Sequence, residues 1–174
     1  MKIKWKSLGR SEMGDGLVIT LEREHTRLLL ASKFKDQKST FYHALMSKGY
    51  SQIYRAPNGL KAVKLAKQHR PHIVLMDTPM LYLFGYEACR EIKQALGKDE
   101  VVVVGMYGSP TKESPYVESW VRAGADSVLW KPEVLYGADG HGIPKVNSLN
   151  LGNIGAFLDK VIKEELGKHR TTLL

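Results

Sequence analysis

Two short apolar runs, each ending at a charged residue, constrain the fold of this chain most. Residues 73–76 lead into Asp77, and residues 128–130 lead into Lys131. Runs of this length and composition are typical of parallel strands that are buried on both faces of a sheet. In such folds ligands bind outside the carboxyl ends of the strands. A carboxylate and an ammonium are therefore predicted at the same edge of one sheet.

Apolar runs alternate with amphipathic stretches from about residue 27 onward. Strands are predicted at residues 28–31, 53–54, 73–76, 101–104 and 127–130. Helices are predicted at residues 36–48, 58–66, 86–96, 115–123 and 154–166. Strands and helices in this alternation predict an α/β fold, a doubly wound, five-stranded parallel sheet with helices on both faces.

Two segments lie outside this alternation. Residues 1–26 form an extension, either a hairpin that turns near Gly14 or an arm without fixed structure. Residues 27–174 make up the domain, with a long loop at residues 133–151 inserted before the last helix. Asp139 and His141 in this loop are interpreted as ordinary loop residues, because no further ligand is spaced to complete a metal site.

The composition is that of an ordinary globular protein, and we expect a cytoplasmic location without membrane attachment. No signal-peptide pattern follows the basic start of the chain, and no run reaches the ~20 apolar residues that a membrane-spanning helix needs. Cys89 is the only cysteine, which fits a reducing compartment. Its place in a helical pattern predicts a packed side chain rather than a nucleophile.

Positive charge is concentrated in the first part of the chain. Residues 1–70 contain 15 Lys and Arg and 5 Asp and Glu, whereas residues 71–174 contain 11 and 13. A basic half can face nucleic acid, an anionic surface or an acidic partner, or it can simply keep the protein in solution. No helix-turn-helix, zinc or RNA-binding signature accompanies the lysines, so nucleic acid is not expected as a partner.

An ordered set of motifs surrounds Asp77 and Lys131. It consists of Asn58-Gly59, Arg70-Pro71-His72, Met76-Asp77, Gly85-Tyr86, Ala123-Gly124-Ala125-Asp126 and Lys131-Pro132. In this order and spacing, residues 27–132 resemble the receiver domain of two-component response regulators. The resemblance covers about three fifths of the chain. It implies a flavodoxin-like or CheY-like (βα)5 fold and a role in phosphorelay signalling, with no enzymatic activity.

The resemblance assigns roles to the two charged residues. Asp77 occupies the position of the aspartate that a partner histidine kinase phosphorylates. Lys131 occupies the position of the lysine that contacts the phosphoryl oxygen. Pro79 stands where the family uses a backbone carbonyl to bind the metal, and a proline retains that carbonyl.

This chain departs from the family at two further sets of positions. The acidic pair that holds Mg²⁺ in receivers falls at Ser32 and Lys33. Since Mg²⁺ prefers carboxylate and water oxygens, its binding is expected to be weak or absent, and we expect no other cofactor. The switch hydroxyl of the fourth strand falls at Met106, and the aromatic residue of the fifth strand falls at Val128.

We therefore interpret the chain as a degenerate receiver, or pseudo-receiver, that acts through protein–protein contacts without phosphorylation. One hypothesis places the Lys33 ammonium in the space of the metal, where Lys33 and Lys131 together hold Asp77 ionised. In the alternative, Lys33 points into water.

Two other functions stay open. A histidine kinase can still phosphorylate Asp77 despite the altered pocket, which makes the chain a working phosphoacceptor. Otherwise the frame belongs to a flavodoxin-like cofactor-binding protein or enzyme. That function needs a loop that cradles phosphate, and residues 105–109 are the candidate.

Receivers commonly dimerise or contact partners through the fourth helix, fifth strand and fifth helix, and the resemblance points to this face. Tyr116, Trp120 and Trp130 fall on or near it, and aromatic side chains are frequent anchors of interfaces. The spacing of Val117 and Trp120 is equally that of core residues. The expected partner is another signalling protein, either a histidine kinase or an output protein, or a second copy in a homodimer.

Overall fold

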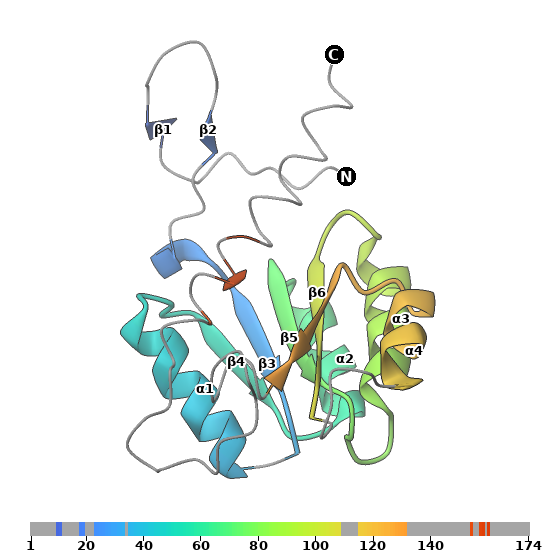
Figure 1. Cartoon of the computed structure of the whole chain (residues 1–174). Coiled ribbons are helices and arrows are strands. Elements are labelled where there is room, and N and C mark those ends of the chain that lie inside the picture. The colour runs from blue at the N-terminus through green and yellow to red at the C-terminus, as the bar shows by residue number, and fades with distance from the viewer. Residues whose placement is uncertain are drawn as a thin grey trace.

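The central sheet contains five parallel strands in the order β4-β3-β5-β6-β7 (Figure 1). The fold is that of a computed structural model, which describes residues 10–11, 18–19, 23–33, 35–108 and 115–131 and residues 154, 157, 158 and 160, with only the backbone for residues 10–11, 18–19 and 35–40. The strands are β3 (Leu28–Ala31), β4 (Ile53–Ala56), β5 (Ile73–Asp77), β6 (Val102–Tyr107) and β7 (Ser127–Trp130). The predicted doubly wound α/β fold is confirmed.

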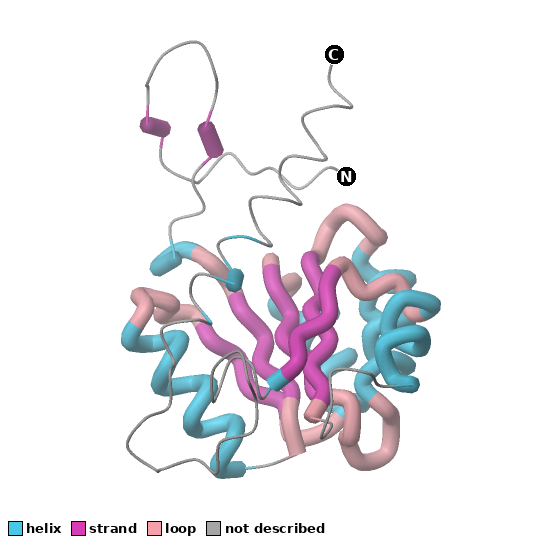
Figure 2. The backbone as a smooth tube through the Cα atoms, viewed as in Figure 1, coloured by secondary structure: helices cyan, strands magenta, loops and turns pink. Residues whose placement is uncertain are grey.

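Helices lie between the strands and cover both faces of the sheet (Figures 1 and 2). They are α1 (Lys35–Ser47), α2 (Gly59–His69), α3 (Gly85–Leu96) and α4 (Pro115–Arg122). Helix α1 packs on one face, and α2, α3 and α4 pack on the other. Helix α1 begins at Lys35, so Asp36 lies in its first turn.

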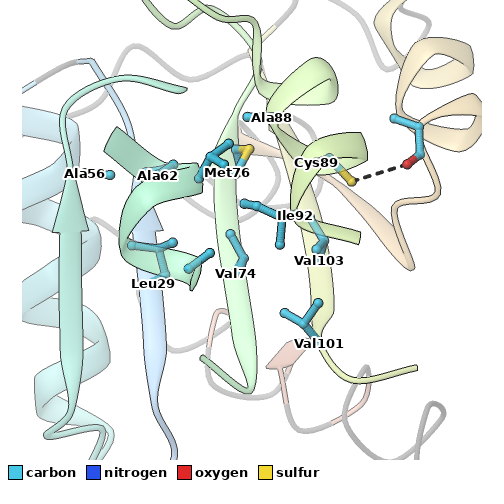
Figure 3. Packing of buried hydrophobic residues seen from close by; sticks show 14 of the residues in the cluster. Leu29, Ala56, Ala62, Val74, Met76, Ala88, Cys89, Ile92, Val101 and Val103 are labelled. Atoms are coloured by element: carbon cyan, nitrogen blue, oxygen red, sulfur yellow. Dashed lines mark hydrogen bonds between the residues drawn. The ribbon is translucent and has the colours of Figure 1, made fainter. Parts of the chain in front are cut away.

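The core consists of two layers of side chains, one on each face of the sheet. Alternate residues of a strand point to opposite faces, so Leu28 and Leu30 meet α1, whereas Leu29 packs toward α2 and α3. Figure 3 shows the second layer, in which Ile92 of α3 packs among side chains from the strands. Cys89 belongs to this layer, fully buried, with Sγ 3.7 Å from the carbonyl oxygen of Ala123. The prediction that Cys89 is a packed residue is confirmed.

Local chemistry sets the helix ends. The Asn58 side chain accepts a hydrogen bond of 2.8 Å from the backbone N–H of Lys61, which caps α2. At the end of α3, Gly97 has a φ of +104° and its N–H donates to the carbonyl of Lys93. Both boundaries agree with the sequence-based expectation.

A buried ion pair ties α3 to the neighbouring strands. Lys93 Nζ lies 2.6 Å from Asp126 Oδ2 and also donates to the carbonyls of Lys98 and Val101. Asp126 in turn accepts from the backbone N–H of Val103. The Lys93 ammonium is therefore removed from solvent with several acceptors around it, as a buried charge requires.

A buried histidine precedes β5. His72 Nδ1 accepts a hydrogen bond of 3.1 Å from the backbone N–H of Arg27. Burial, and secondarily the positive charge of Arg27, lowers the pKa of His72 to about 4. The folded protein therefore holds His72 neutral across the physiological pH range.

Residues 1–26 contain a short antiparallel pair. Strand β1 (Arg10–Ser11) pairs with β2 (Val18–Ile19), which is the arrangement of the hairpin alternative, and a 3-10 helix follows at Arg23–His25. Near the other end of the chain, Ile154 and Leu158 are buried against the layer that contains α1. Residues 133–151, with Asp139 and His141, lie outside the described residues. Among the described helices, none has the length and apolar character to cross a membrane.

Candidate functional site

Asp77 lies at the carboxyl end of the central strand. Strand β5 pairs with β3 and β6, so that Met76 faces Ala31 on one side and Asp77 faces Met106 on the other. All residues of β5 are buried, and Asp77 retains only 1% of its exposure. The apolar run of β5 therefore ends at a carboxylate that is almost completely buried, and a buried carboxylate requires hydrogen-bond donors.

Lys131 supplies the positive charge next to Asp77. Its Nζ lies 2.9 Å from Oδ1 and 3.1 Å from Oδ2 of the carboxylate, and both side chains are buried. Lys131 follows β7, two strands away from β5, and its side chain passes Gly108, where an added Cβ would lie 3.2 Å from Lys131 Cε. The sequence-based prediction that these two charges share one sheet edge agrees with this geometry.

Two neutral donors complete the surroundings of the carboxylate. Ser32 Oγ donates to Asp77 Oδ2 at 3.1 Å, and the backbone N–H of Thr78 lies 3.1 Å from Oδ1. Ser32 is buried at the end of β3. Within the described chain, the contacts of the Asp77 carboxylate are therefore one ammonium, one hydroxyl and one backbone N–H.

Lys33 is not among the contacts of the Asp77 carboxylate in the described chain. Its side chain is exposed, and in the described chain the cation that contacts Asp77 is Lys131. The hypothesis that the Lys33 ammonium fills the space of the metal is not supported. The physical reason is that a lysine at the end of β3 can reach water, which solvates its charge better than a buried pocket does.

The residues present do not fit a Mg²⁺ ion. The described chain contains no group of three or more His, Cys, Asp or Glu side chains arranged to hold a metal. At the positions of the acidic pair stand the Ser32 hydroxyl, which is engaged with Asp77, and the exposed Lys33. Asp77 is left as the carboxylate of the site, whereas Mg²⁺ in proteins favours carboxylate and water oxygens in an octahedral shell.

The two altered switch positions are part of the packed interior. Met106 is buried in the layer that contains α1, and its carbonyl accepts hydrogen bonds of 2.8 Å from both the N–H and the Oγ1 of Thr78. Val128 is half-buried and packs against the opposite layer. Neither side chain carries a hydroxyl or an aromatic ring, so neither can perform the switch role that the family assigns to its position.

Trp120 of α4 occupies the space between β6 and the start of α3. Its indole is fully buried, and Nε1 donates to Thr78 Oγ1 at 2.9 Å. An added Cβ at Gly105 would lie 2.3 Å from Trp120 Cδ2, and one at Gly85 would lie 2.8 Å from Cη2. Two glycines therefore make room for one ring, which is hydrogen-bonded to the residue after Asp77.

Sequence reasoning did not assign these roles to Thr78 and Trp120. The available signal was Gly105, an isolated glycine in a β-branched run, since such a glycine often marks close approach by another group. Because Gly105 is buried under the indole, it is not placed to cradle a phosphate. Ser109, at the end of the candidate loop at residues 105–109, lies outside the described residues.

The expected aromatic anchors of the interface are mostly core residues. Trp120 is fully buried, and Trp130 retains 7% exposure. Tyr116 alone of the three is exposed. The burial of Trp120 agrees with its alternative assignment to the core, and the burial of Trp130 does not support an interface role for that residue. The sequence could not separate the two assignments, because helical or strand spacing of aromatic residues is the same for a core and for a docking face.

Comparisons with known proteins agree with this geometry. A family model described as the response regulator receiver domain matches residues 31–135. The chemotaxis protein CheY of Bacillus subtilis is 27% identical over 106 residues, which cover 61% of this chain and 85% of CheY. Protein PilH of Pseudomonas aeruginosa is 33% identical over 90 residues, which cover 51% of this chain and 72% of PilH.

Solved structures show the same likeness. The response regulator domain of Thermotoga maritima CheB aligns with a TM-score of 0.60 at 21% identity, covering 80% of this chain and 96% of that domain. The receiver domain of a Pseudomonas aeruginosa sensor histidine kinase aligns with a TM-score of 0.55 at 26% identity, covering 62% and 85%. The latter structure holds a magnesium ion coordinated in its active-site cleft.

Proposed function

The chain belongs to the response regulator receiver domain family, and we propose that it is a degenerate receiver that signals through protein contacts without phosphorylation of Asp77. As a receiver it is a signalling module of a two-component system.

The surroundings of Asp77 carry this proposal. In receivers, an acidic pair and the phosphoacceptor aspartate together attract a divalent cation beside one lysine. Here one carboxylate faces one ammonium at 2.9 Å, and the pair is electrically neutral. Each unit charge about 6 Å from a divalent ion contributes about 5 kcal/mol at an effective dielectric near 20. Replacement of the acidic pair by Ser32 and Lys33 therefore removes most of the attraction for Mg²⁺.

Phosphoryl transfer depends on that attraction. Cations neutralise the charge that develops on the transferred group and align the reacting oxygens. Lys131 supplies one such charge, but it already forms an ion pair with the carboxylate that would have to attack. The chemistry is therefore expected to be slow.

The link from Asp77 to α4 is packed rather than switchable. Thr78 is held by the carbonyl of Met106 and by the indole of Trp120, and the indole fills the space above Gly105. A hydroxyl switch moves toward a phosphoryl group in an active receiver, but a methionine offers no such group. These contacts favour a single conformation with permanent binding surfaces.

The partner proposed from the family is another signalling protein, either a histidine kinase or an output protein. A homodimer through α4, β7 and the following helix remains a proposal, with Tyr116 as the exposed aromatic on that face. A working phosphoacceptor is the second candidate function, and the retained contact between Asp77 and Lys131 is the observation that favours it.

Phosphorylation with acetyl phosphate and Mg²⁺ separates the two functions. We expect the intact chain to show no mass increase of one phosphoryl group in mass spectrometry. The double variant Ser32→Asp, Lys33→Asp restores the acidic pair and is expected to gain that mass, whereas the same variant with Asp77→Asn is not. Stoichiometric phosphorylation of the unmodified chain at Asp77 would reject the degenerate receiver in favour of the working phosphoacceptor.

A further inference from the structure

Four large apolar side chains lie exposed at the loop that follows Asp77. Leu81, Tyr82 and Phe84 belong to this loop, and Leu60 belongs to the first turn of α2; their exposed fractions range from 48% for Phe84 to 81% for Tyr82. The loop and the start of α2 are in contact, because an added Cβ at Gly59 would lie 2.3 Å from the backbone oxygen of Leu83. We call Leu60, Leu81, Tyr82 and Phe84 the apolar ridge.

The backbone of the loop holds the ridge outward at some cost. Tyr82 has a φ of +65°, a left-handed conformation that is energetically unfavourable in residues other than glycine, asparagine and aspartate. The rings of Phe84 and Tyr86 stack with centroids 5.5 Å apart, and Tyr86 meets the buried Trp120 edge-on. Phe84 of the ridge is therefore linked through Tyr86 to the packed core.

Positive charges continue from the ridge along α2. Lys61, Lys64 and Lys67 are all exposed, and their spacing of three residues places them on neighbouring positions of the helix surface. Leu60 lies four residues before Lys64 and shares its face. We call these three lysines the cationic row.

The stretch of sequence that contains the row has no carboxylates, although Glu87 of the neighbouring α3 lies beside the ridge, where its carboxylate accepts a hydrogen bond from the backbone N–H of Phe84. Between Asp36 and Asp77 the sequence contains seven Lys and Arg and no Asp or Glu. This stretch forms most of α1, the edge strand β4, α2 and most of β5 (Figure 1). Arg55 of β4 lies over the ring of Tyr42 of α1, on the face of the sheet opposite to α2. By contrast, the exposed apolar residues of α4, Tyr116 and Val121, stand beside Glu118 and Arg122, which form an ion pair.

We infer that the apolar ridge and the cationic row form one docking surface for an acidic segment of a partner protein that carries apolar side chains. Contiguous exposed apolar residues mark interaction sites, and a few buried anchors supply most of the affinity. Complementary charge steers the partner and fixes its register. The inference rests on the proposed function, namely signalling through a protein contact, and it names the surface and the chemistry of the partner.

The chemistry of the surface favours a protein segment over nucleic acid. Leu60 and Leu81 can neither stack on bases nor hydrogen-bond to them, and the row consists of lysines rather than the arginines that grip phosphates in bidentate fashion. Leu60 and the cationic row together extend along α2 for about 10 Å. This narrow, elongated arrangement matches one helical or extended segment with apolar residues at one end and carboxylates along its length.

A titration of the full-length chain tests this inference. The probe is a fluorescein-labelled amphipathic peptide with leucine and phenylalanine on one face and glutamate on the other, and binding is followed by anisotropy. The matched probe has glutamine in place of glutamate. We expect the double variants Leu81→Ser, Tyr82→Ser and Lys61→Glu, Lys64→Glu each to weaken binding by about tenfold or more. The loss in the lysine variant should shrink at high salt.

Matched controls use equally exposed residues outside the surface. Val121→Ser on α4 and Lys98→Glu after α3 should each leave the affinity within about twofold. Because every substituted side chain is exposed, circular dichroism and urea unfolding should remain unchanged, so a loss of binding reports on the surface itself.

Each remaining outcome decides the matter. Equal binding of both peptides, equal loss in the controls, or no binding by the unmodified chain would overturn the inference. So would preferential binding to phosphatidylserine vesicles or to duplex DNA that depends on the same residues, since the surface would then serve lipid or nucleic acid. If beryllofluoride with Mg²⁺ alters the peptide affinity, the phosphorylation-independent function fails while the surface stands. If the surface variants bind normally and beryllofluoride has no effect, the surface fails alone.

Discussion

Substitution of Gly105 by alanine tests how Trp120 is packed beside the site. The added methyl carbon would lie 2.3, 2.6 and 2.7 Å from three atoms of the indole, whereas carbon atoms in contact are about 3.5–4.0 Å apart. The ring would therefore have to move by about 1 Å. It has no room to do so on the side of Gly85, where another Cβ position lies 2.8 Å from the ring.

The expected loss of stability follows from two effects. Overpacking of a core typically costs about 1–3 kcal/mol, and displacement of the indole breaks its hydrogen bond to Thr78, which contributes about 1 kcal/mol. We expect Gly105→Ala to lower the free energy of unfolding by about 2–4 kcal/mol. Urea denaturation followed by circular dichroism measures this value, and the emission of Trp120 should shift to the red.

Two comparisons make the result specific. Gly108→Ala meets only the far part of the flexible Lys131 side chain, at 3.2 Å, and should cost less than about 1 kcal/mol. In a Trp120→Phe background, Gly105→Ala should cost at least about 1 kcal/mol less than in the unmodified chain, because the two sites are in contact. An unchanged unfolding free energy in both backgrounds would show that the indole does not fill the space above Gly105.

Three further predictions concern the rest of the core. Unfolded His72 takes up a proton near pH 6.5 and folded His72 only near pH 4. The free energy of unfolding should therefore fall by up to about 3 kcal/mol as the pH drops through this window. Urea denaturation at both pH values should show that a His72→Gln variant lacks this loss. Lys93→Met should lower the free energy of unfolding by about 3 kcal/mol, because it leaves the partly buried Asp126 without its cation. Glu118→Gln breaks an exposed ion pair and should lower it by under about 1 kcal/mol. Similar losses for the two variants would contradict this account. Burial raises the pKa of the Cys89 thiol to about 12, so its reaction with a disulfide reagent should track global unfolding, and rapid labelling of the folded chain would show that the thiol is accessible.

Most of the fold was predictable because it depends on local signals. The apolar runs gave the bounds of β3 and β7 as the structure has them. Asn58 caps the start of α2 and Gly97 follows the end of α3, each through contacts within a few residues. Strand β6 extends to Tyr107, beyond the predicted end of the run at residue 104. The reason is that pairing with β5 and the hydrogen bonds to Thr78 continue the ladder past Gly105.

The site was predictable only where topology determines it. Asp77 and Lys131 meet because both end parallel strands at the same sheet edge. The exposure of Lys33 depends on where a long side chain finds water, which no spacing in the sequence encodes. The burial of Trp120 depends on contacts with Gly85 and Gly105, residues distant in the chain that become neighbours only in the folded sheet.

The most direct test of the central claim is calorimetric titration of the chain with Mg²⁺, in the absence and presence of beryllofluoride, beside the Ser32→Asp, Lys33→Asp variant. A receiver whose pocket carries no net negative charge should release no binding heat and leave the amide resonance of Asp77 unmoved, while the variant should bind the ion. Saturable binding of Mg²⁺ by the unmodified chain, with a shift of that resonance, would contradict the account.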